Sequence, residues 1–495
     1  MDEKILFWID SKLTYFGLAH YLQKKINAEF YAIIDITNKT KTFFQEQKFV
    51  NFEKYWFYFD YIKKENSKPD LEYLSTIEKK YDLKIWELAL NERIFYKFNK
   101  FHKFTTDEIL CIIEKECRLF ENILNEVKPT CLIIKETIQH KDHLFYQMCK
   151  KKGLKILMLS QPNFGYRCNI SSTPHQFEIK PNLMSIESKE RSFEEIKEWT
   201  KKFSNYKQQS ELSDAFATSK FQRFFAAIEF FRSRNTNVRT HYTYFGRTKF
   251  NVLLYELSST IKKRYREYFM RKNFIKKIDF NEKFVYFPLT VDEERNLLLG
   301  APNYTNQIEI IRHIVKSLPV DYKLYVKESP SQIVRKWRSI SEYKEILSIP
   351  NVRLIHPSVS PEKIFAKTSL VITISGTSGL EAAFHKIPSI IFSDITYSVL
   401  PSVNVIKSIN DLQTSIRDSL KKSVSVSDLD KYITFLEDNS FIFDQYGLDT
   451  IDHNHFFHGG HLVDVNITSS QMEIYLKNNE LVFEKLSEEF KKRLL

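Results

Sequence analysis

Apolar runs and amphipathic segments alternate in the first third of the chain. Uninterrupted apolar stretches predict buried strands at 4–10, 30–36, 131–136 and 155–162, and apolar positions at helical spacing predict helices at 17–26 and 142–152. Gly153 follows the second helix, at a position where helices commonly end. Because strands that alternate with helices usually pair in parallel, we expect a parallel sheet covered by helices.

The same alternation returns in the second half. Strands are predicted at 283–289, 322–330, 351–355, 370–374 and 388–392, with helices at 306–317, through 340–347 and at 361–367. The stretch at 190–278 has a mostly helical pattern, and a last helix is predicted at 469–495. The fold class is therefore α/β, with two Rossmann-like domains joined by a helical linker and followed by a C-terminal helix. The expected segments are 1–190, 191–280, 281–425 and 426–495.

Length and composition fit two folded domains. The chain has 495 residues, which is too long for a single ordinary hydrophobic core. Its hydrophobic fraction of 43% is consistent with folded domains. The five cysteines form no CxxC pair, which argues against a disulfide framework or a zinc site and favours a reducing compartment. No basic leader precedes the first strand and no apolar run reaches about 18 residues, so we expect a soluble cytoplasmic protein.

Positive charge is concentrated in the predicted linker. The segment 221–278 contains 14 Lys and Arg residues and three Glu residues, and carries nearly all of the chain's net charge of +12. Aromatic residues lie among these cations, as at Phe224, Phe225, Tyr265 and Tyr268. Such a segment is typical of a helix resting on anionic lipid, of a surface that grips single-stranded nucleic acid, or of a solvated helix with its aromatics packed inward.

A turn of small residues follows the strand at 370–374. In a chain with only 10 glycines, its members are Ser375, Gly376, Thr377, Ser378 and Gly379. Small residues allow several N–H groups to converge, and the following helix adds its positive end, so the turn suits a phosphate or a carboxylate. Glu381 lies in the first turn of that helix, within reach of ribose hydroxyls. The other interpretation is an ordinary tight turn with Thr377 or Ser378 as the N-cap.

Polar side chains stand where the predicted strands end, and ligands of parallel sheets bind beyond these ends. The first half offers Asp10, Glu136 and Gln161, with Arg167 in the loop that follows. The second half offers Asp292, Glu293 and Lys327. Glu136 and Asp10 are candidates for the catalytic base, and the candidates for acceptor or cleft contacts are Gln161, Arg167, Asp292 and Glu293. Each is also explained as a solvated loop residue or a helix cap.

Four histidines lie close together near the C-terminal end, at His453, His455, His458 and His461. Their spacing lacks the i, i+4 pair that a helical zinc site uses. We therefore expect a polar loop here and no metal site.

Several motifs of the second half together resemble a known family. They are FVYFPL at 284–289, the helix entered through Asn306 and Gln307, LYVKESP at 324–330, NVRLI at 351–355 and ISGTSGLEAAFHKIPSIIF at 374–392. Over about 283–403 the chain resembles the C-terminal domain of capsule and surface polysaccharide biosynthesis proteins, including Kdo-transferase-like glycosyltransferases of the GT-B type. The resemblance implies a nucleotide-sugar donor domain at 281–425 and an acceptor domain at 1–190.

The resemblance also assigns roles to residues. In similar proteins the small-residue turn and the acid after it hold the nucleotide-sugar donor, which matches Ser375 to Gly379 and Glu381 here. The chain departs from the pattern at Ser329, where many relatives have a histidine associated with the nucleotide phosphate. That departure puts a CMP-sugar donor in doubt, and Lys327 or His356 is the expected positive partner of the phosphate.

The activity implied by the resemblance is glycosyl transfer without a metal, from a nucleotide-sugar donor to a surface glycan of the capsule, lipopolysaccharide or S-layer type. No cofactor is expected beyond the nucleotide-sugar co-substrate. Because such acceptors are often lipid-linked, we expect the basic segment to bind an anionic membrane surface at the inner face of the cell membrane, and no nucleic acid. Alternatives are a sugar-nucleotide epimerase, a polyol-phosphate transferase and a non-catalytic glycan-assembly protein. The sequence leaves the oligomeric state open.

Overall fold

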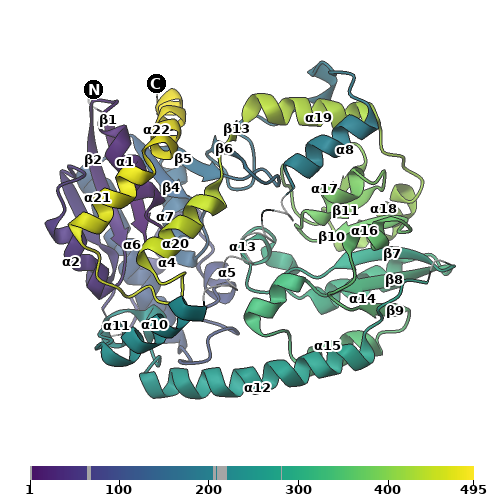
Figure 1. Cartoon of the computed structure of the whole chain (residues 1–495), viewed down its shortest axis with the longest axis horizontal. Coiled ribbons are helices and arrows are strands. Elements are labelled where there is room, and N and C mark those ends of the chain that lie inside the picture. Colours follow the sequence, from purple (N-terminus) through teal and green to yellow (C-terminus); the bar gives the residue numbers. More distant parts are fainter. Residues whose placement is uncertain (1–2, 64–67, 205–207, 209–219, 280, 495) are drawn as a thin grey trace. The chain divides into compact units, whose positions relative to one another are not determined.

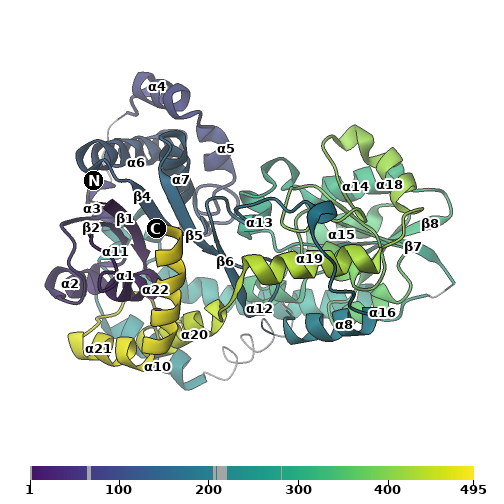
Figure 2. The same cartoon turned by 90° about the horizontal axis from the view of Figure 1, so that it is seen from above.

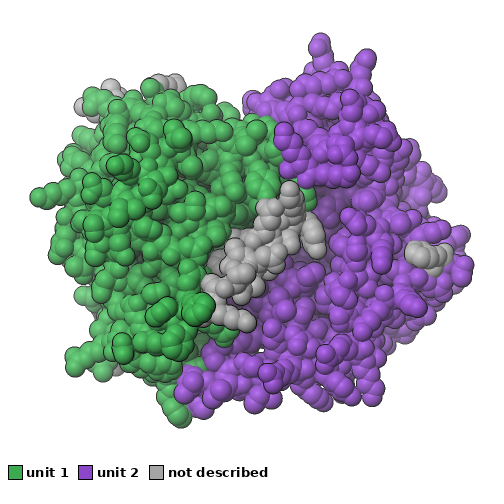
Figure 3. Space-filling model, in the orientation of Figure 1, with its two compact units in different colours: residues 1–178, 203–252, 440–495 green, residues 179–202, 253–439 purple. Residues whose placement is uncertain are grey.

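The computed structural model describes residues 3–63, 68–204, 208, 220–279 and 281–494, and it divides the chain into two compact units (Figure 3). Unit 1 comprises residues 1–178, 203–252 and 440–495, and unit 2 comprises residues 179–202 and 253–439. The predicted linker at 191–280 is thus not a separate segment, because its helices are shared between the units. From residue 440 on, the C-terminal segment belongs to unit 1.

Unit 1 is built on a seven-stranded sheet in the order β13-β6-β5-β4-β1-β2-β3 (Figure 1). Its strands are β1 Glu3–Asp10, β2 Ala28–Asp35, β3 Lys54–Phe57, β4 Cys131–Lys135, β5 Lys155–Ser160, β6 Arg167–Ser171 and β13 Phe441–Ile442. The strands β1 to β5 pair in parallel, whereas β6 and β13 are antiparallel additions at one edge. The four predicted strands are confirmed. Of the strands that were not predicted, β13 is short and β6 is polar, whereas β3 lies in an aromatic run at 55–59 that continues into α3.

Helices cover both faces of this sheet (Figure 2). They are α1 Thr14–Leu22, α2 Asn38–Glu46, α3 Tyr58–Tyr61, α4 Leu71–Tyr81, α5 Ile85–Leu90, α6 Thr106–Val127, α7 His140–Lys151, α10 Lys220–Arg232, α11 Asn237–Thr240, α20 Gln445–Phe456, α21 Ser469–Asn478 and α22 Glu480–Leu494. On one face, the ring of Trp8 in β1 lies 6.0 Å from that of Phe120 in α6 and 5.8 Å from that of Phe145 in α7.

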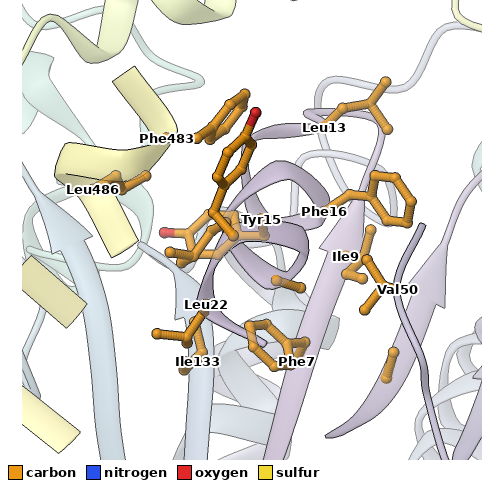
Figure 4. Packing of buried hydrophobic residues seen from close by; sticks show 14 of the residues in the cluster. Phe7, Ile9, Leu13, Tyr15, Phe16, Leu22, Val50, Ile133, Phe483 and Leu486 are labelled. Carbon is orange, nitrogen blue, oxygen red and sulfur yellow. The ribbon is translucent and has the colours of Figure 1, made fainter. Parts of the chain in front are cut away.

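The opposite face of the sheet is closed by α1 and the C-terminal helices. Side chains alternate along a strand, so Phe7 and Ile9 of β1 point to this face and pack in one core with α1 and α22 (Figure 4). The rings of Tyr21 and Phe483 stack there, with centroids 5.8 Å apart. The single helix predicted at 469–495 is in fact two helices, because α21 ends at Asn478 and α22 begins at Glu480.

Unit 2 is built on a six-stranded, wholly parallel sheet in the order β12-β11-β10-β7-β8-β9. Its strands are β7 Lys283–Pro288, β8 Tyr322–Lys327, β9 Val352–Ile355, β10 Leu370–Thr373, β11 Ser389–Ile391 and β12 Val403–Val405. The accompanying helices are α8 Phe193–Lys202, α12 Lys249–Asn273 (whose first residues belong to unit 1), α13 Arg295–Leu298, α14 Gln307–Ser317, α15 Ile340–Ser348, α16 Pro361–Phe365, α17 Ser378–Ala383, α18 Leu412–Ser419 and α19 Val426–Asn439.

The two sheets share one strand order. Numbered within its own unit, each has the order 3-2-1-4-5 typical of Rossmann-like domains, which confirms the prediction of two such domains. The order reverses between β1 and β4 in unit 1 and between β7 and β10 in unit 2. Ligands of open parallel sheets bind at such switch points, beyond the carboxyl ends of the strands.

Candidate functional site

The candidate site of unit 2 lies at the switch point between β7 and β10. In the sheet register Pro288 is opposite Lys327, so β7 and β8 end side by side, and β10 runs along the other side of β7. The turn at 375–377 leaves β10 at the same edge and leads into α17. The predicted donor residues of the turn and Lys327 are thus brought to one edge of one sheet.

Lys327 is a buried cation at the end of β8. Only 4% of the residue is exposed, and its ammonium makes no hydrogen bond or ion pair with any residue that the structure describes. Burial lowers the pKa of Lys327 to about 8, and the carboxylate of Glu381 opposes that effect. A buried ammonium is costly unless an anion accompanies it, so this position favours a negatively charged ligand.

Glu381 lies next to this cation in the first turn of α17. Burial raises the pKa of its carboxyl group, while a hydrogen bond from the Thr377 hydroxyl (3.0 Å to Oε1) and the charge of Lys327 lower it. Thr377 therefore fixes the carboxylate without neutralising it. The predicted contact between Glu381 and a ribose stays a prediction.

The two glycines of the turn make room for side chains of the protein. A Cβ atom on Gly376 would lie 2.7 Å from the Thr373 hydroxyl, and one on Gly379 would lie 2.6 Å from the hydroxyl of Tyr397. Neither glycine has a positive φ, so space and not backbone angle requires them. The sequence gives no signal for Tyr397, which is 18 residues further along the chain.

Hydrogen bonds within the turn decide which amides remain for a ligand. The Gly376 N–H donates to Thr373 Oγ1 (3.2 Å), and the Tyr397 hydroxyl donates to the Gly376 carbonyl and accepts from the Gly379 N–H. The N–H groups of Thr377 and Ser378 have no partner among the described residues. The helix α17 has only six residues, so its dipole adds less than the sequence suggests.

Ser375 and the acids after β7 are bound to neighbouring segments. The Ser375 hydroxyl donates to the Asn296 carbonyl oxygen (2.9 Å). Asp292 accepts from Gln307 (2.9 Å) and forms an ion pair with Arg338, and Glu293 forms one with Arg335 (3.1 Å). These contacts hold the loop after β7, and the predicted contacts of Asp292 and Glu293 with substrate stay predictions.

Arg338, which the sequence analysis missed, organises this loop from within. It is 5% exposed, and its guanidinium donates to Glu328 (2.8 Å) and to the Thr290 carbonyl oxygen (2.5 Å) as well as binding Asp292. Glu328 also accepts from the hydroxyl of Tyr343 (2.9 Å). The ends of β7 and β8 are therefore fixed by a buried polar network, which positions Lys327.

The other two predicted phosphate partners lie differently. Ser329 directly follows this network, where its N–H donates to Glu328 (2.8 Å). His356 follows the edge strand β9, and both β7 and β8 separate β9 from the turn after β10. Burial, Lys276 and Arg271 lower the pKa of His356, and its Nδ1 lies 2.7 Å from the hydroxyl of Ser358. Of the predicted cations, Lys327 is thus the one at the switch point, and its contact with a phosphate stays a prediction.

In unit 1 the predicted carboxylates meet at the switch point between β1 and β4. The register pairs Phe7 with Ile133, so Asp10 and Glu136, three residues further on, end neighbouring strands. Asp10 forms an ion pair with Lys135 and accepts from the Lys12 N–H (3.0 Å). Glu136 accepts from the Ser160 hydroxyl and from the His175 N–H (2.9 Å).

Tyr15 and His175 complete this edge of unit 1, and sequence reasoning missed both. Burial raises the pKa of Tyr15 well above its usual value, and the charges of Asp10 and Glu136 add to the rise, which places its hydroxyl near both acids. His175 has a left-handed backbone (φ 53°). Its Nδ1 lies 3.6 Å from Glu136. Glu136 therefore has neutral donors and a histidine around it, whereas Asp10 has a lysine.

Gln161 and Arg167 hold the antiparallel edge of the sheet. Gln161 donates to the Phe164 carbonyl oxygen (2.7 Å) and to Gln208 (2.8 Å). Arg167 donates to the hydroxyl (2.9 Å) and the carbonyl oxygen (3.0 Å) of Ser440, just before β13. Their predicted contacts with an acceptor stay predictions.

The histidine cluster is not the predicted loop throughout. His453 and His455 lie in α20, and His458 and His461 lie in the turn after it. His455 Nε2 lies 3.0 Å from the Gln471 carbonyl oxygen and His458 Nε2 lies 2.9 Å from Glu229. In the described part of the chain no cluster of three or more His, Cys, Asp or Glu could hold a metal ion. No helix among these residues is long and apolar enough to cross a bilayer.

A family model matches the segment that contains these motifs. Residues 195–419 match the family described as capsule polysaccharide biosynthesis protein, and this range includes β7 to β12 and every motif that carries the sequence resemblance. The match covers less than half of the chain, and over this segment it agrees with the predicted resemblance to capsule polysaccharide biosynthesis proteins. No protein of curated description matches the chain in sequence.

Several solved structures resemble the chain at low identity. UDP-GlcNAc 2-epimerase from Methanocaldococcus jannaschii is 13% identical, with a TM-score of 0.25, over 88% of this chain and 99% of the other. The beta Kdo 2,7 transferase KpsC from Thermosulfurimonas dismutans is 11% identical, with a TM-score of 0.27, over 65% of this chain and 89% of the other. The beta Kdo 2,4 transferase KpsC from the same organism is 9% identical, with a TM-score of 0.28, over 61% of this chain and 79% of the other. Likeness at this level carries no argument about activity, and the fold rests on the two sheets described above.

Proposed function

We propose that this protein transfers a sugar from a nucleotide-sugar donor to a glycan acceptor in surface polysaccharide assembly. The observation that carries the proposal is the buried ammonium of Lys327 at the switch point of unit 2, which makes no hydrogen bond or ion pair with a described residue. It stands beside a turn with two free amides, within the segment that matches the capsule polysaccharide family. A nucleotide phosphate has the charge that this position favours.

The proposed reaction needs stabilisation of a leaving phosphate. The bond between the anomeric carbon and the phosphate oxygen breaks, and the phosphate keeps the electron pair. The acceptor oxygen bonds to that carbon and loses its proton to a base. Lys327 and the N–H groups of Thr377 and Ser378 supply positive charge where the leaving group becomes more negative.

For the base we propose Glu136 ahead of Asp10. The carboxylate of Asp10 is already engaged in an ion pair with the ammonium of Lys135. Glu136 accepts hydrogen bonds from a hydroxyl and an amide, which orient its carboxylate. Its neighbour His175 offers a route for the proton.

The membrane surface is the finer part of the proposal. The segment 221–278 holds nearly the whole net charge, and a lipid-linked acceptor would have to be met at a membrane. We propose a cytoplasmic protein that binds peripherally to the anionic inner face of the cell membrane.

A thermal-shift panel with UDP, GDP, dTDP and CMP tests the donor site, since a ligand of the native state raises the melting temperature by mass action. We expect at least one nucleotide to raise it in the wild type and not in Lys327→Gln. Lys323→Gln, on the same strand β8, is the matched control and keeps the response. No response to any nucleotide would refute the donor site.

Release of free nucleotide then separates the enzyme classes. A transferase releases nucleotide from its sugar donor at a rate that depends on the acceptor. Release that is equally fast without acceptor would favour the epimerase alternative, and a bound but unreacted donor would favour a glycan-assembly protein.

A further inference from the structure

A stripe of exposed apolar side chains follows α12, the long helix labelled in Figure 1. Its members, between 43 and 71% exposed, are Leu253, Leu254, Leu257, Ile261, Tyr265 and Tyr268. From Leu254 on they follow in steps of three and four residues, and Leu253 lies four residues before Leu257, so all six share one side of the helix along about 22 Å. We call these six residues the α12 stripe.

The opposite face of α12 is the one that packs on unit 2. Met270 and Ser259 are buried there, and Arg266 donates to the carbonyl oxygens of Lys336 and Trp337 (both 2.7 Å). A surface helix normally turns its apolar stripe to the core and its polar face to water. Here the apolar stripe faces away from the core, so another apolar surface is needed to cover it.

The charges around the stripe are all positive. Lys262, Arg264, Arg271 and Lys272 are exposed and make no hydrogen bond or ion pair with a described residue. The two carboxylates of the helix lie on the packing side, where Glu256 binds Lys336 (2.8 Å) and Glu267 accepts from the Trp337 indole (3.2 Å). The exposed half of α12 therefore combines apolar side chains with uncompensated cations.

We propose that the α12 stripe is the element that enters an anionic lipid surface, lying parallel to it at the headgroup level. The aliphatic side chains reach the acyl region, the two tyrosines lie at the interface, and the four cations meet lipid phosphates. Aliphatic side chains do not stack on bases, which disfavours single-stranded nucleic acid. A second copy of α12 would bring like charges together.

This inference deepens the membrane location proposed above and rests on it, but it does not rest on glycosyl transfer. It also corrects the electrostatic expectation from the sequence. Arg266, one of the 14 cations of the basic segment, is engaged with unit 2 and does not belong to the lipid contact.

Vesicle flotation of the full chain tests the proposal. We expect the wild type to float with vesicles of phosphatidylglycerol and phosphatidylcholine and not with phosphatidylcholine alone. The triple variant Leu257→Ser, Ile261→Ser, Tyr265→Ser should lose more than about tenfold of this binding, because three inserted side chains are removed. Met184→Ser, Val320→Ser, Leu481→Ser removes three apolar side chains elsewhere that are even more exposed, and this variant should float like the wild type.

Two further measurements separate the proposal from its rivals. High salt should weaken flotation without abolishing it, since only the charge contribution is screened. The stripe variant should keep the wild-type melting temperature and nucleotide response, so that lost flotation reports the surface and not the fold or the donor site. Equal flotation of the stripe variant and the wild type overturns the proposal. Wild-type self-association without flotation, abolished in the stripe variant, would instead show a contact between two copies.

Discussion

The ammonium of Lys327 costs the apoprotein stability that a bound anion would restore. Its pKa falls from the ordinary 10.5 to about 8, which corresponds to a cost of about 3 kcal/mol at neutral pH. We expect Lys327→Met to raise the free energy of unfolding of unit 2 at pH 7 by about 1–3 kcal/mol while removing the nucleotide-induced thermal shift. Chemical denaturation and the nucleotide panel measure the two effects. A variant that is less stable than the wild type at pH 7 would show that Lys327 has a partner in the apoprotein.

The two acids at the edge of unit 1 should respond differently to loss of charge. Asp10→Asn leaves the side chain of Lys135, which is 15% exposed, without its nearest carboxylate, so we expect a loss of stability of about 1–3 kcal/mol. Glu136→Gln keeps an acceptor for Ser160 and His175, so we expect near-native stability and a fall in acceptor-dependent turnover of about 100-fold or more. Urea denaturation and nucleotide release give both values. Equal turnover of Glu136→Gln and wild type would eliminate it as the base.

Single residues set the limit of what the sequence could predict about the site. The motif at 375–381 and Lys327 could be found because each follows an apolar run and so marks a strand end. Tyr397 and Arg338 could not, because each comes from a distant segment and reaches the site only through tertiary packing. The sequence correctly predicted that Gly376 and Gly379 allow a close approach to the backbone. The groups that approach are the hydroxyls of Thr373 and Tyr397.

At the scale of elements, the contact between α1 and α22 offers a sharp test. A Cβ atom on Gly17 would overlap the ring of Phe483, so Gly17 is required by the C-terminal helix. In an isolated helix Gly→Ala stabilises by about 1 kcal/mol, but here we expect Gly17→Ala to destabilise unit 1 by about 1–3 kcal/mol.

The same substitution in a variant without the Phe483 ring shows whether that ring causes the loss of stability. In Phe483→Leu the same Gly17→Ala change should cost little or become favourable, because the smaller side chain leaves room for the methyl group. Urea denaturation of the four proteins gives the coupling energy. Additive effects would mean that α22 does not pack on α1 through this pair.

Most elements with an apolar run could be predicted, and those without one could not. In unit 2 the strands β7, β8, β10 and β11 have three or four consecutive buried residues, and β9 has three buried apolar residues with the exposed Arg353 among them. The antiparallel edge of unit 1 is different, because β6 alternates polar side chains that are nevertheless buried and β13 has two residues. Its pairing joins residue 168 to residue 441, and local patterns carry no information about so distant a partner. The division of 191–280 between the two units likewise depends on contacts with distant segments, so local patterns could not predict it.

At the scale of the whole molecule, each unit contains a buried base, and the pKa values of these two bases are shifted in opposite directions. In unit 1, His140 lies between Glu92 and Glu116, each 2.9 Å away. Burial alone would lower the pKa of His140, but the two carboxylates raise it to about 10. The stabilisation from this cluster is therefore complete below about pH 6.5, the pKa of an unperturbed histidine, and is lost as the pH rises to about 10.

In unit 2 the sign is reversed, since the pKa of Lys327 is lowered. The cost of its buried charge is complete below about pH 8 and is relieved as the pH rises toward 10.5, where the unfolded chain also loses the proton. We therefore expect two calorimetric transitions that move apart between pH 7 and 10, with that of unit 1 falling and that of unit 2 rising. The transition that a nucleotide raises identifies unit 2. In Lys327→Met that transition should no longer rise with pH, while the fall of the other remains. If two transitions are seen and that of unit 2 also falls in the wild type, Lys327 does not carry a buried charge at pH 7, and its assignment as a charged phosphate partner fails.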